Sequence, residues 1–386
     1  MTPLLAGPYR RCVWPPNVAS RARFRGPGRG PFSRNEAISG MSSRDNDDLV
    51  RRALKGERVP LARAISLVEN EAPQAIAILD AAFAGSGAAF RIGITGPPGA
   101  GKSTLVTRLA QEYRRRGETV AIVAVDPTSP FTGGALLGDR VRMGELSGDE
   151  GVFIRSMATR GSMGGLAVHT AQVCDVLDAA HFTRILIETV GVGQSELEVA
   201  QTADSTAVVL VPESGDGVQA MKAGLMEIGD LFVVNKADRE GAERAAFAVK
   251  AALELRTPGD RTPPVLLTTA SLSEGIHEVV EAFEEHLEHL QRHGDLERRR
   301  RARLEQRLND LMRERLWGEF RARVPERQWQ ASVDGMMDHR LTPHQAAERL
   351  ARFASPSRNG ESVPAVHRRR GSNRLSGART SRGSAA

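Results

Sequence analysis

The sequence reads Gly96-Pro97-Pro98-Gly99-Ala100-Gly101-Lys102-Ser103-Thr104 directly after the apolar run 90–94 and directly before the apolar positions Leu105, Val106 and Leu109. This order of strand, glycine-rich turn and helix is the one that the pattern G-x-x-x-x-G-K-[ST] requires. Glycines let the backbone fold closely around a polyphosphate, and the helix start adds the positive end of its dipole. We therefore predict that residues 96–104 bind phosphates, with Lys102 on the β and γ phosphates and the Ser103 hydroxyl on Mg²⁺.

Strand-like and helix-like segments alternate from Phe90 onward. The predicted strands are 90–95, 119–125, 152–156, 184–188, 206–211, 230–235 and 264–269, and the predicted helices are 102–116, 166–181, 217–227, 240–255 and 275–292. This alternation is typical of an α/β protein whose mostly parallel, doubly wound sheet is covered by helices on both faces. We therefore expect a P-loop NTPase fold with its ligand at the carboxyl ends of the strands.

Three acidic residues follow predicted strands or the turn-rich segments after them. Glu188 ends the strand 184–187 and stands three residues before Gly191, while Asp126 ends an earlier strand and Asp139 follows a turn-rich segment. An acid in the position of Glu188 can hold Mg²⁺ or its water, and the N–H of Gly191 can meet the γ phosphate. We assign Lys102, Asp126 and Glu188 to catalysis and Ser103, Asp126, Asp139 and Glu188 to the metal. The alternative is that these acids are ordinary turn or surface residues.

The segment Asn235-Lys236-Ala237-Asp238 ends a predicted strand well after the phosphate loop. A carboxylate at Asp238 can accept hydrogen bonds from guanine N1–H and the 2-amino group, whereas adenine would leave the charge unpaired. Lys236 is expected over the base and Asn235 is expected to brace the loop. Thr269-Ala270-Ser271, at the end of the next strand, can contact guanine O6. The sequence therefore predicts GTP rather than ATP as the ligand.

The flanking regions differ in composition from the central domain at 89–292. Residues 1–41 are rich in Pro, Gly and Arg, and we expect a disordered basic tail or an upstream extension of a chain whose translation starts at Met41. Residues 42–88 show helical periodicity and are expected to pack against the domain. Residues 293–354 form an expected helical arm with a long charged helix at 296–324 and a last helix from Thr342-Pro343 to Phe353. Residues 355–386 are expected to be disordered.

Charge and composition narrow the possible partners. The tails 1–40 and 355–386 hold seven Arg each against one Glu each, so the net charge of +6 becomes −6 over residues 41–354. An acidic central region argues against nucleic-acid binding. The sequence shows no apolar run of the roughly 20 residues needed to span a bilayer. Two cysteines, Cys12 and Cys174, form no disulfide framework or zinc motif, as expected in a reducing compartment.

The chain resembles the methylmalonyl-CoA mutase-associated GTPases of the MeaB/MMAA type, whose relatives have also been called ArgK or LAO/AO transport ATPases. The resemblance covers roughly residues 45–350, and these are the segments that carry it: 96–104, Val125-Asp126-Pro127-Thr128-Ser129, Gly133 to Arg140, Phe153 to Met157, Glu188-Thr189-Val190-Gly191-Val192-Gly193-Gln194-Ser195-Glu196, and Asn235 to Asp238. The run from Glu188 to Glu196 is the most specific of them.

The resemblance implies a homodimeric SIMIBI-class G protein that binds GTP and GDP and uses Mg²⁺. It implies a partner, an adenosylcobalamin-dependent acyl-CoA mutase, whose cofactor loading and protection the protein would gate. Methylmalonyl-CoA and isobutyryl-CoA mutases both remain possible clients. The resemblance also implies metal-site or switch roles for Asp126, Asp139 and Glu188, a further switch at 212–224, and a dimer made by the C-terminal arm.

Three alternatives stay open at this point. A nickel-type metallocentre-insertion GTPase would need Cys or His near the switch, and Cys174 and His169 are the nearest pair. A kinase or transport-linked NTPase fits the older naming. The arm could also pack on its own domain instead of forming a dimer. We expect a cytoplasmic protein without membrane or nucleic-acid contacts, or a mitochondrial matrix protein if the chain is eukaryotic and its N-terminal segment is a transit peptide.

Overall fold

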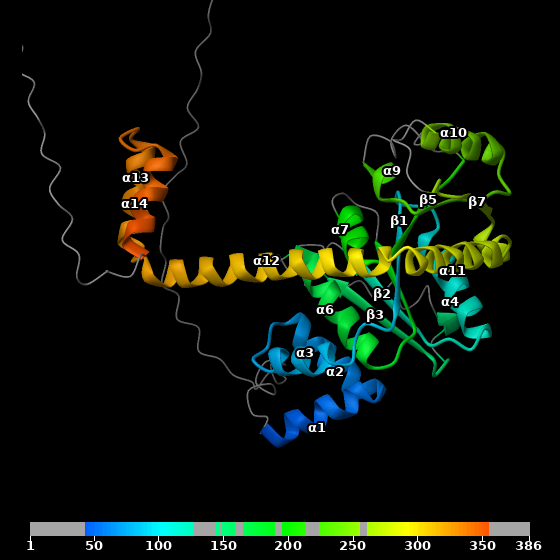
Figure 1. The fold of residues 1–386 in the computed structure, drawn as a ribbon, viewed down its shortest axis with the longest axis horizontal. Coiled ribbons are helices and arrows are strands. Elements are labelled where there is room, and N and C mark those ends of the chain that lie inside the picture. Colours follow the sequence, from blue (N-terminus) through cyan, green and yellow to red (C-terminus); the bar gives the residue numbers. More distant parts are fainter. Residues whose placement is uncertain are drawn as a thin grey trace, which may run out of the picture.

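The central feature of the structure is a sheet of seven strands in the order β3-β2-β4-β1-β5-β6-β7, every neighbouring pair of which is parallel (Figure 1). The structure is a computed structural model that describes residues 43–126, 144–146, 148–158, 165–189, 195–212, 224–254 and 261–354. The strands are β1 (Phe90–Thr95), β2 (Val120–Asp126), β3 (Val152–Ala158), β4 (Arg184–Thr189), β5 (Ser205–Leu210), β6 (Leu231–Asn235) and β7 (Val265–Thr268). The predicted doubly wound α/β fold is confirmed.

Helices cover both faces of the sheet because successive side chains of each strand point to opposite faces. On β2, Ile122 belongs to the core under α4 (Lys102–Arg115) and α11 (Ile276–Arg292). Its neighbours Ala121 and Val123 belong to the core under α6 (Gly165–Ala179) on the other face. The remaining helices of the domain are α7 (Ser195–Thr202), α9 (Leu225–Ile228) and α10 (Ala242–Glu254), with the short 3₁₀ turns η1 (Gly144–Leu146) and η2 (Ala270–Leu272).

The N-terminal extension consists of three helices, α1 (Ser43–Leu54), α2 (Arg58–Glu69) and α3 (Ala75–Phe83). Their buried side chains, such as Leu61, Ile65 and Ile78, belong to one apolar cluster with Val173 and Leu177 of α6. The extension therefore has no core of its own and completes one face of the nucleotide domain.

The C-terminal arm leaves the domain as a 29-residue helix, α12 (Asp295–Arg323), and ends in α13 (Glu326–Met337) and α14 (Pro343–Ala354). In Figure 1 α12 runs past α6 and α7 and carries α13 and α14 away from the sheet. No residue of α12 is fully buried. At the start of α14, Thr342 Oγ1 accepts a hydrogen bond from Gln345 N, and Thr342 N donates to Gln345 Oε1, which confirms the predicted start of this helix.

The strand predictions were correct to within about two residues, but the helix predictions were incomplete. Helices α7 and α13 were not predicted. The tails and most of the three proposed switch segments at 127–140, 189–196 and 212–224 lie outside the described residues, as does most of the helix predicted at 217–227. Within the part of the chain that the structure describes, no helix is both long and apolar enough to cross a membrane.

Candidate nucleotide-binding site

The phosphate loop joins β1 to α4 and needs glycine at two positions for steric reasons. A Cβ at Gly96 would lie 2.1 Å from the carbonyl oxygen of Val209, and one at Gly101 would lie 2.4 Å from Nδ2 of Asn235. Both glycines also have positive φ angles, of 139° and 88°. The loop therefore lies against the end of β5 on one side and against the base-recognition segment on the other, and its backbone leads into the N-terminus of α4, which favours anions.

Lys102 and Ser103 begin α4, and their side chains contact different segments, the phosphate loop and strand β4. The Lys102 side chain is buried, and its Nζ donates to the carbonyl oxygens of Gly96 (2.8 Å) and Pro97 (2.9 Å). The Ser103 hydroxyl donates to Glu188 Oε1 at 2.6 Å. The hydroxyl and the carboxylate that we predicted as metal-site residues therefore lie within hydrogen-bond distance of each other.

A Mg²⁺ ion fits this pair chemically, because it prefers hard oxygen ligands and is commonly bound by one or two protein groups together with phosphates and water. Glu188 is the last residue but one of β4 and is 5% exposed, so its carboxylate is held at the edge of the sheet. One residue further on, Thr189 Oγ1 donates to Thr95 Oγ1 at 3.2 Å, which ties the end of β4 to the end of β1. Sequence reasoning missed this pair of threonines, although both stand at the carboxyl ends of predicted strands.

Asp126 lies at the same edge of the sheet as Glu188. In the β2–β4 register Ala124 stands opposite Glu188, and Asp126 is the last residue of β2. The side chain of Asp126, and the whole of Asp139 and Gly191, lie outside the described residues. Their predicted roles therefore stay predictions.

Asn235 ties the base-recognition segment to the phosphate loop. Its side chain is buried at the end of β6, and Nδ2 donates to the carbonyl oxygen of Ala100 at 2.8 Å. Its Oδ1 accepts from the backbone N of Ala270 and from Thr268 Oγ1, both at 3.1 Å. One amide thus joins the phosphate loop, β6 and the end of β7.

Lys236 and Asp238 follow Asn235 in a tight turn. Lys236 adopts a positive φ of 60°, which is uncommon for a residue other than glycine, and its Nζ donates to the carbonyl oxygen of Gly99 at 2.8 Å. Asp238 is exposed, so its carboxylate is accessible to a ligand. The backbone N of Ala237 donates to the Thr268 carbonyl at 3.0 Å, so this turn lies beside the chain that continues into Thr269, Ala270 and Ser271.

Cys174 and His169, the pair considered for a nickel-insertion GTPase, do not form a metal site in the described part of the chain. Cys174 is fully buried in α6, and burial raises the pKa of its thiol to about 12, so it is not a ready metal ligand. Among the described residues there is no group of three or more His, Cys, Asp or Glu side chains that could hold a metal ion.

Comparison with known proteins gives consistent results. The family model described as methylmalonyl-CoA mutase-associated GTPase MeaB matches residues 61–324. A putative GTPase of Pyrococcus abyssi is 46% identical over 308 residues, which are 79% of this chain and 95% of that protein. The mitochondrial methylmalonic aciduria type A homolog of Mus musculus is 33% identical over 82% of this chain and 81% of its own length. A crystal structure of a LAO/AO transport system kinase superposes with a TM-score of 0.63 at 29% identity, over 82% of this chain and 99% of that one.

Proposed function

The chain belongs to the family of methylmalonyl-CoA mutase-associated GTPases, MeaB, and we propose from this premise that it is a GTP-driven chaperone of an adenosylcobalamin-dependent acyl-CoA mutase. Its relatives are named GTPases, and it is a P-loop GTPase. In our proposal, nucleotide binding and hydrolysis gate the loading of the mutase with its cofactor and protect the loaded enzyme.

The observation that carries the proposed hydrolysis chemistry is the 2.6 Å hydrogen bond between Ser103 and Glu188. It brings the hydroxyl of the phosphate loop to the acid at the end of β4, the arrangement that a phosphate-bound divalent cation needs. Ser103 and Glu188, with Asp126 and Asp139 as further candidates, would hold Mg²⁺, which neutralises phosphate charge when bound. Lys102 would exchange its carbonyl partners for phosphate oxygens.

Guanine recognition would come from the turn that Asn235 and Lys236 hold in place. Both side chains bind backbone carbonyls of the phosphate loop, so the base-reading and phosphate-binding segments support each other. Asp238 would accept the guanine N1–H and 2-amino hydrogens, and the backbone at Thr269, Ala270 and Ser271 would contact O6. No Gln or Arg in the sequence is clearly assigned to the transition state, so we expect slow hydrolysis that a partner accelerates.

The proposal of a mutase client rests on the family description, which names methylmalonyl-CoA mutase, and on the named mouse relative. Methylmalonyl-CoA mutase is therefore the first client to test. Neither comparison identifies the client of this chain, and an isobutyryl-CoA mutase would present the same cofactor and a similar substrate.

We also propose that the arm makes a homodimer. Leucines at 304, 308 and 311 form an apolar stripe on α12, and each of them is between 42% and 60% exposed. Farther along, α12, α13 and α14 enclose an apolar cavity of about 790 Å³ that includes Trp317, Phe320 and Trp329. Apolar surface of this extent is what a second subunit would cover.

Co-purification tests the client proposal. The tagged full-length chain should retain a cobalamin-dependent mutase of the same organism, detected by its activity after adenosylcobalamin is added. A variant with Lys102→Ala serves as the nucleotide-binding control, because its retention of the mutase should no longer depend on GTP or GDP. Failure of the wild-type chain to bind any such mutase in either nucleotide state would contradict the chaperone role but not the GTPase assignment.

A further inference from the structure

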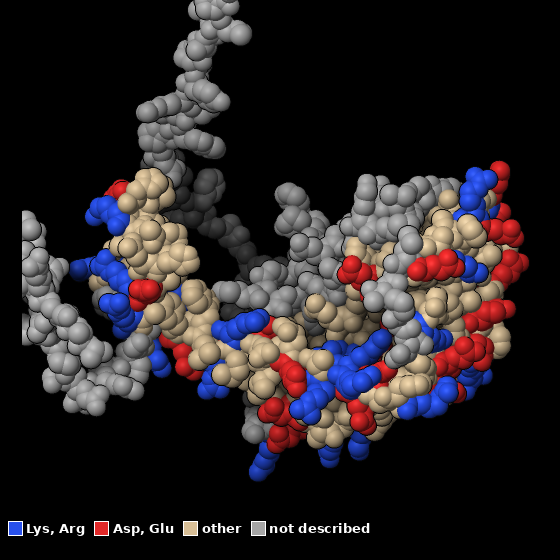
Figure 2. Space-filling model, turned by 45° about the horizontal axis from the view of Figure 1, so that its top comes forward, with Lys and Arg blue, Asp and Glu red and all other residues tan. Residues whose placement is uncertain are grey.

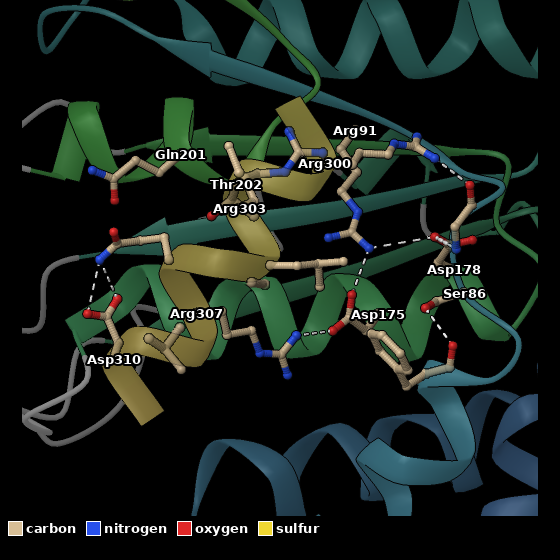
Figure 3. A pocket seen from close by; sticks show the side chains of 17 residues that line it. Ser86, Arg91, Asp175, Asp178, Gln201, Thr202, Arg300, Arg303, Arg307 and Asp310 are labelled. Carbon is tan, nitrogen blue, oxygen red and sulfur yellow. Dashed lines mark hydrogen bonds and ion pairs between the residues drawn. The ribbon is translucent and has the colours of Figure 1, made fainter. Parts of the chain in front are cut away.

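The root of the arm is attached to the domain by arginine side chains rather than by apolar packing. Helix α12 has no fully buried residue and carries a run of four arginines at 298–301. In Figure 2 basic and acidic side chains lie interspersed over the face that is drawn. A cavity of about 530 Å³ lies between α3, α6, α7 and α12, and Arg300, Arg303 and Arg307 of α12 line it (Figure 3). The contact between arm and domain is therefore polar and incompletely packed, and an arrangement of this kind can shift more readily than a close-packed core.

One carboxylate, Asp204, accepts hydrogen bonds from two of these three arginines. It is fully buried, and Arg300 donates to both of its oxygens, to Oδ1 at 3.1 Å and to Oδ2 at 2.8 Å. Arg303 donates to Asp204 Oδ1 and to the carbonyl oxygen of Ala203, and Arg299 donates to the Asp204 carbonyl at 3.0 Å. Burial by itself raises the pKa of Asp204, but Arg300 and Arg303 outweigh it and hold the pKa below its usual value. Asp204 is thus ionised, and both of its carboxylate oxygens accept hydrogen bonds from arm arginines.

Asp204 is also part of the connection that follows helix α7. The helix ends at Thr202, two residues earlier, and Asp204 binds the backbone of β1 through Arg91, whose N donates to Oδ2 at 3.1 Å and whose carbonyl oxygen accepts from Asp204 N at 2.7 Å. Arm arginines therefore hold the C-terminal end of α7 and, through Asp204, the beginning of β1.

The other end of α7 leads toward the nucleotide site. Six residues separate Glu188 from Ser195, the first residue of α7. The helix rests directly on β1, because a Cβ at Gly93 would lie 2.7 Å from Val199 Cγ1 and 3.0 Å from Ala203 Cβ. Gly93 precedes the phosphate loop by three residues. A displacement of α7 would therefore require β1 or these side chains to adjust.

We propose that Arg303 and Asp204 are positioning residues that couple the arm to the nucleotide site through helix α7. The proposal rests on the nucleotide site described above. In this proposal, a shift of Glu188 on nucleotide exchange is accompanied by a shift of α7 and of the arm root. The arm then takes one position with GTP and another with GDP. By linkage, whatever holds the arm changes the relative affinity for the two nucleotides.

Arg307 provides a matched control one turn farther along the same helix. Its side chain is 20% exposed, against 21% for Arg303, and it too pairs with a carboxylate of the domain. Its partner, however, is Asp175 of α6, which also pairs with Arg91 at 2.8 Å, and not a residue of the α7 connection. Arg303→Gln and Arg307→Gln therefore remove the same kind of group from the arm root but cut different connections.

The experiment measures the affinities of the full-length wild type and both variants for GDP and for a non-hydrolysable GTP analogue, each with Mg²⁺. We expect the ratio of the two affinities to change by about fivefold or more in Arg303→Gln and to remain within about twofold of the wild type in Arg307→Gln. An unchanged ratio in Arg303→Gln, or an equal change in both variants, would overturn the proposal.

Hydrogen exchange of the wild type gives a readout that does not depend on the variants folding. Backbone amides of residues 295–307 should exchange at different rates in the GDP and GTP-analogue complexes, because their attachment to α7 differs between the two states. Identical exchange over these residues would refute the coupling even if Arg303→Gln did not fold. Binding of neither nucleotide to the wild type would overturn the site assignment together with the coupling.

Discussion

The side chains that surround the proposed phosphate position are already engaged with the protein. Lys102 binds two carbonyl oxygens of its own loop, and Ser103 binds Glu188. A nucleotide must therefore replace these hydrogen bonds with bonds of its own. Because each replaced bond contributes only about 1 kcal/mol, its loss should cost the fold little, while the loss of the side chains should strongly affect binding.

Replacement of Lys102 by alanine tests this distinction. We expect kcat/KM for GTP to fall on the order of 100-fold or more, since a cationic donor to the transferring phosphate is lost. The free energy of unfolding should change by no more than about 2 kcal/mol, because each of its hydrogen bonds to the Gly96 and Pro97 carbonyls contributes about 1 kcal/mol. Urea denaturation without nucleotide checks the second value, and a loss of cooperative unfolding would show instead that Lys102 is a structural residue.

Asp238→Asn should change the base preference. The wild-type carboxylate accepts two guanine hydrogens, whereas the asparagine side chain offers a donor that suits the 2-oxo group of xanthine. We expect GTP binding to weaken on the order of 10-fold to 100-fold and xanthosine triphosphate binding to strengthen. Competition between GTP, ATP and xanthosine triphosphate on both proteins gives the answer, and equal affinity of the wild type for ATP and GTP would contradict guanine reading by Asp238.

At the scale of helices and strands, apolar periodicity was enough to predict the sheet and most of the helices around it. Each buried strand is a short apolar run, so its bounds are visible in the sequence. Helix α7 was missed because it is eight residues long and follows a glycine-rich run that has its own functional interpretation. The role of Asp204 could not be predicted, because its arginine partners on α12 are about 100 residues away in the sequence and only the fold brings them together.

Helix α11 is joined to the sheet by a buried histidine that predicts a pH dependence. His286 Nδ1 lies 2.7 Å from Ser205 Oγ, and its Nε2 lies 3.6 Å from Asp230 Oδ1. Burial lowers the pKa of His286 from its usual 6.5 to about 4, with smaller contributions from Arg299 and Arg261. The folded protein therefore keeps this ring neutral at a pH where the unfolded chain protonates it.

The stability that depends on neutral His286 is fully present above pH 6.5 and is lost as the pH falls from 6.5 toward 4. Between pH 6.5 and 5 the loss should be about 2 kcal/mol, since one pKa unit corresponds to about 1.4 kcal/mol. Urea denaturation at several pH values should show that His286→Gln removes this part of the slope and that exposed His293→Gln does not. Equal slopes in wild type and His286→Gln would contradict a neutral buried ring.

At the scale of the whole molecule, the arm carries apolar side chains that no other described part of the chain covers. Its root is held by ion pairs, and the leucine stripe at 304, 308 and 311 runs beside these arginines, because Leu304 lines the same cavity as Arg303. Removal of the whole arm at Gly294 would also strip Arg300 and Arg303 from buried Asp204, and an unpaired buried charge is strongly destabilising. Point substitutions on the stripe are therefore the better test of the dimer.

Leu308→Glu should convert the proposed dimer to a monomer, because it places a charge within the apolar stripe. Arg298→Glu is the control, since it introduces the same side chain into the same helix at a residue that is 74% exposed and that lies outside both the leucine stripe and the apolar cavity. Light scattering on both variants and the wild type measures the outcome. A monomeric wild type, or a Leu308→Glu variant that stays dimeric, would leave the arm without its proposed role.

Single-turnover GTP hydrolysis by the full-length chain, with and without the cobalamin-dependent mutases of its own organism, tests the central claim most directly. Our account predicts slow hydrolysis by the chain alone and a clear acceleration by one mutase, which Lys102→Ala abolishes. An unchanged rate in the presence of every such mutase would contradict it.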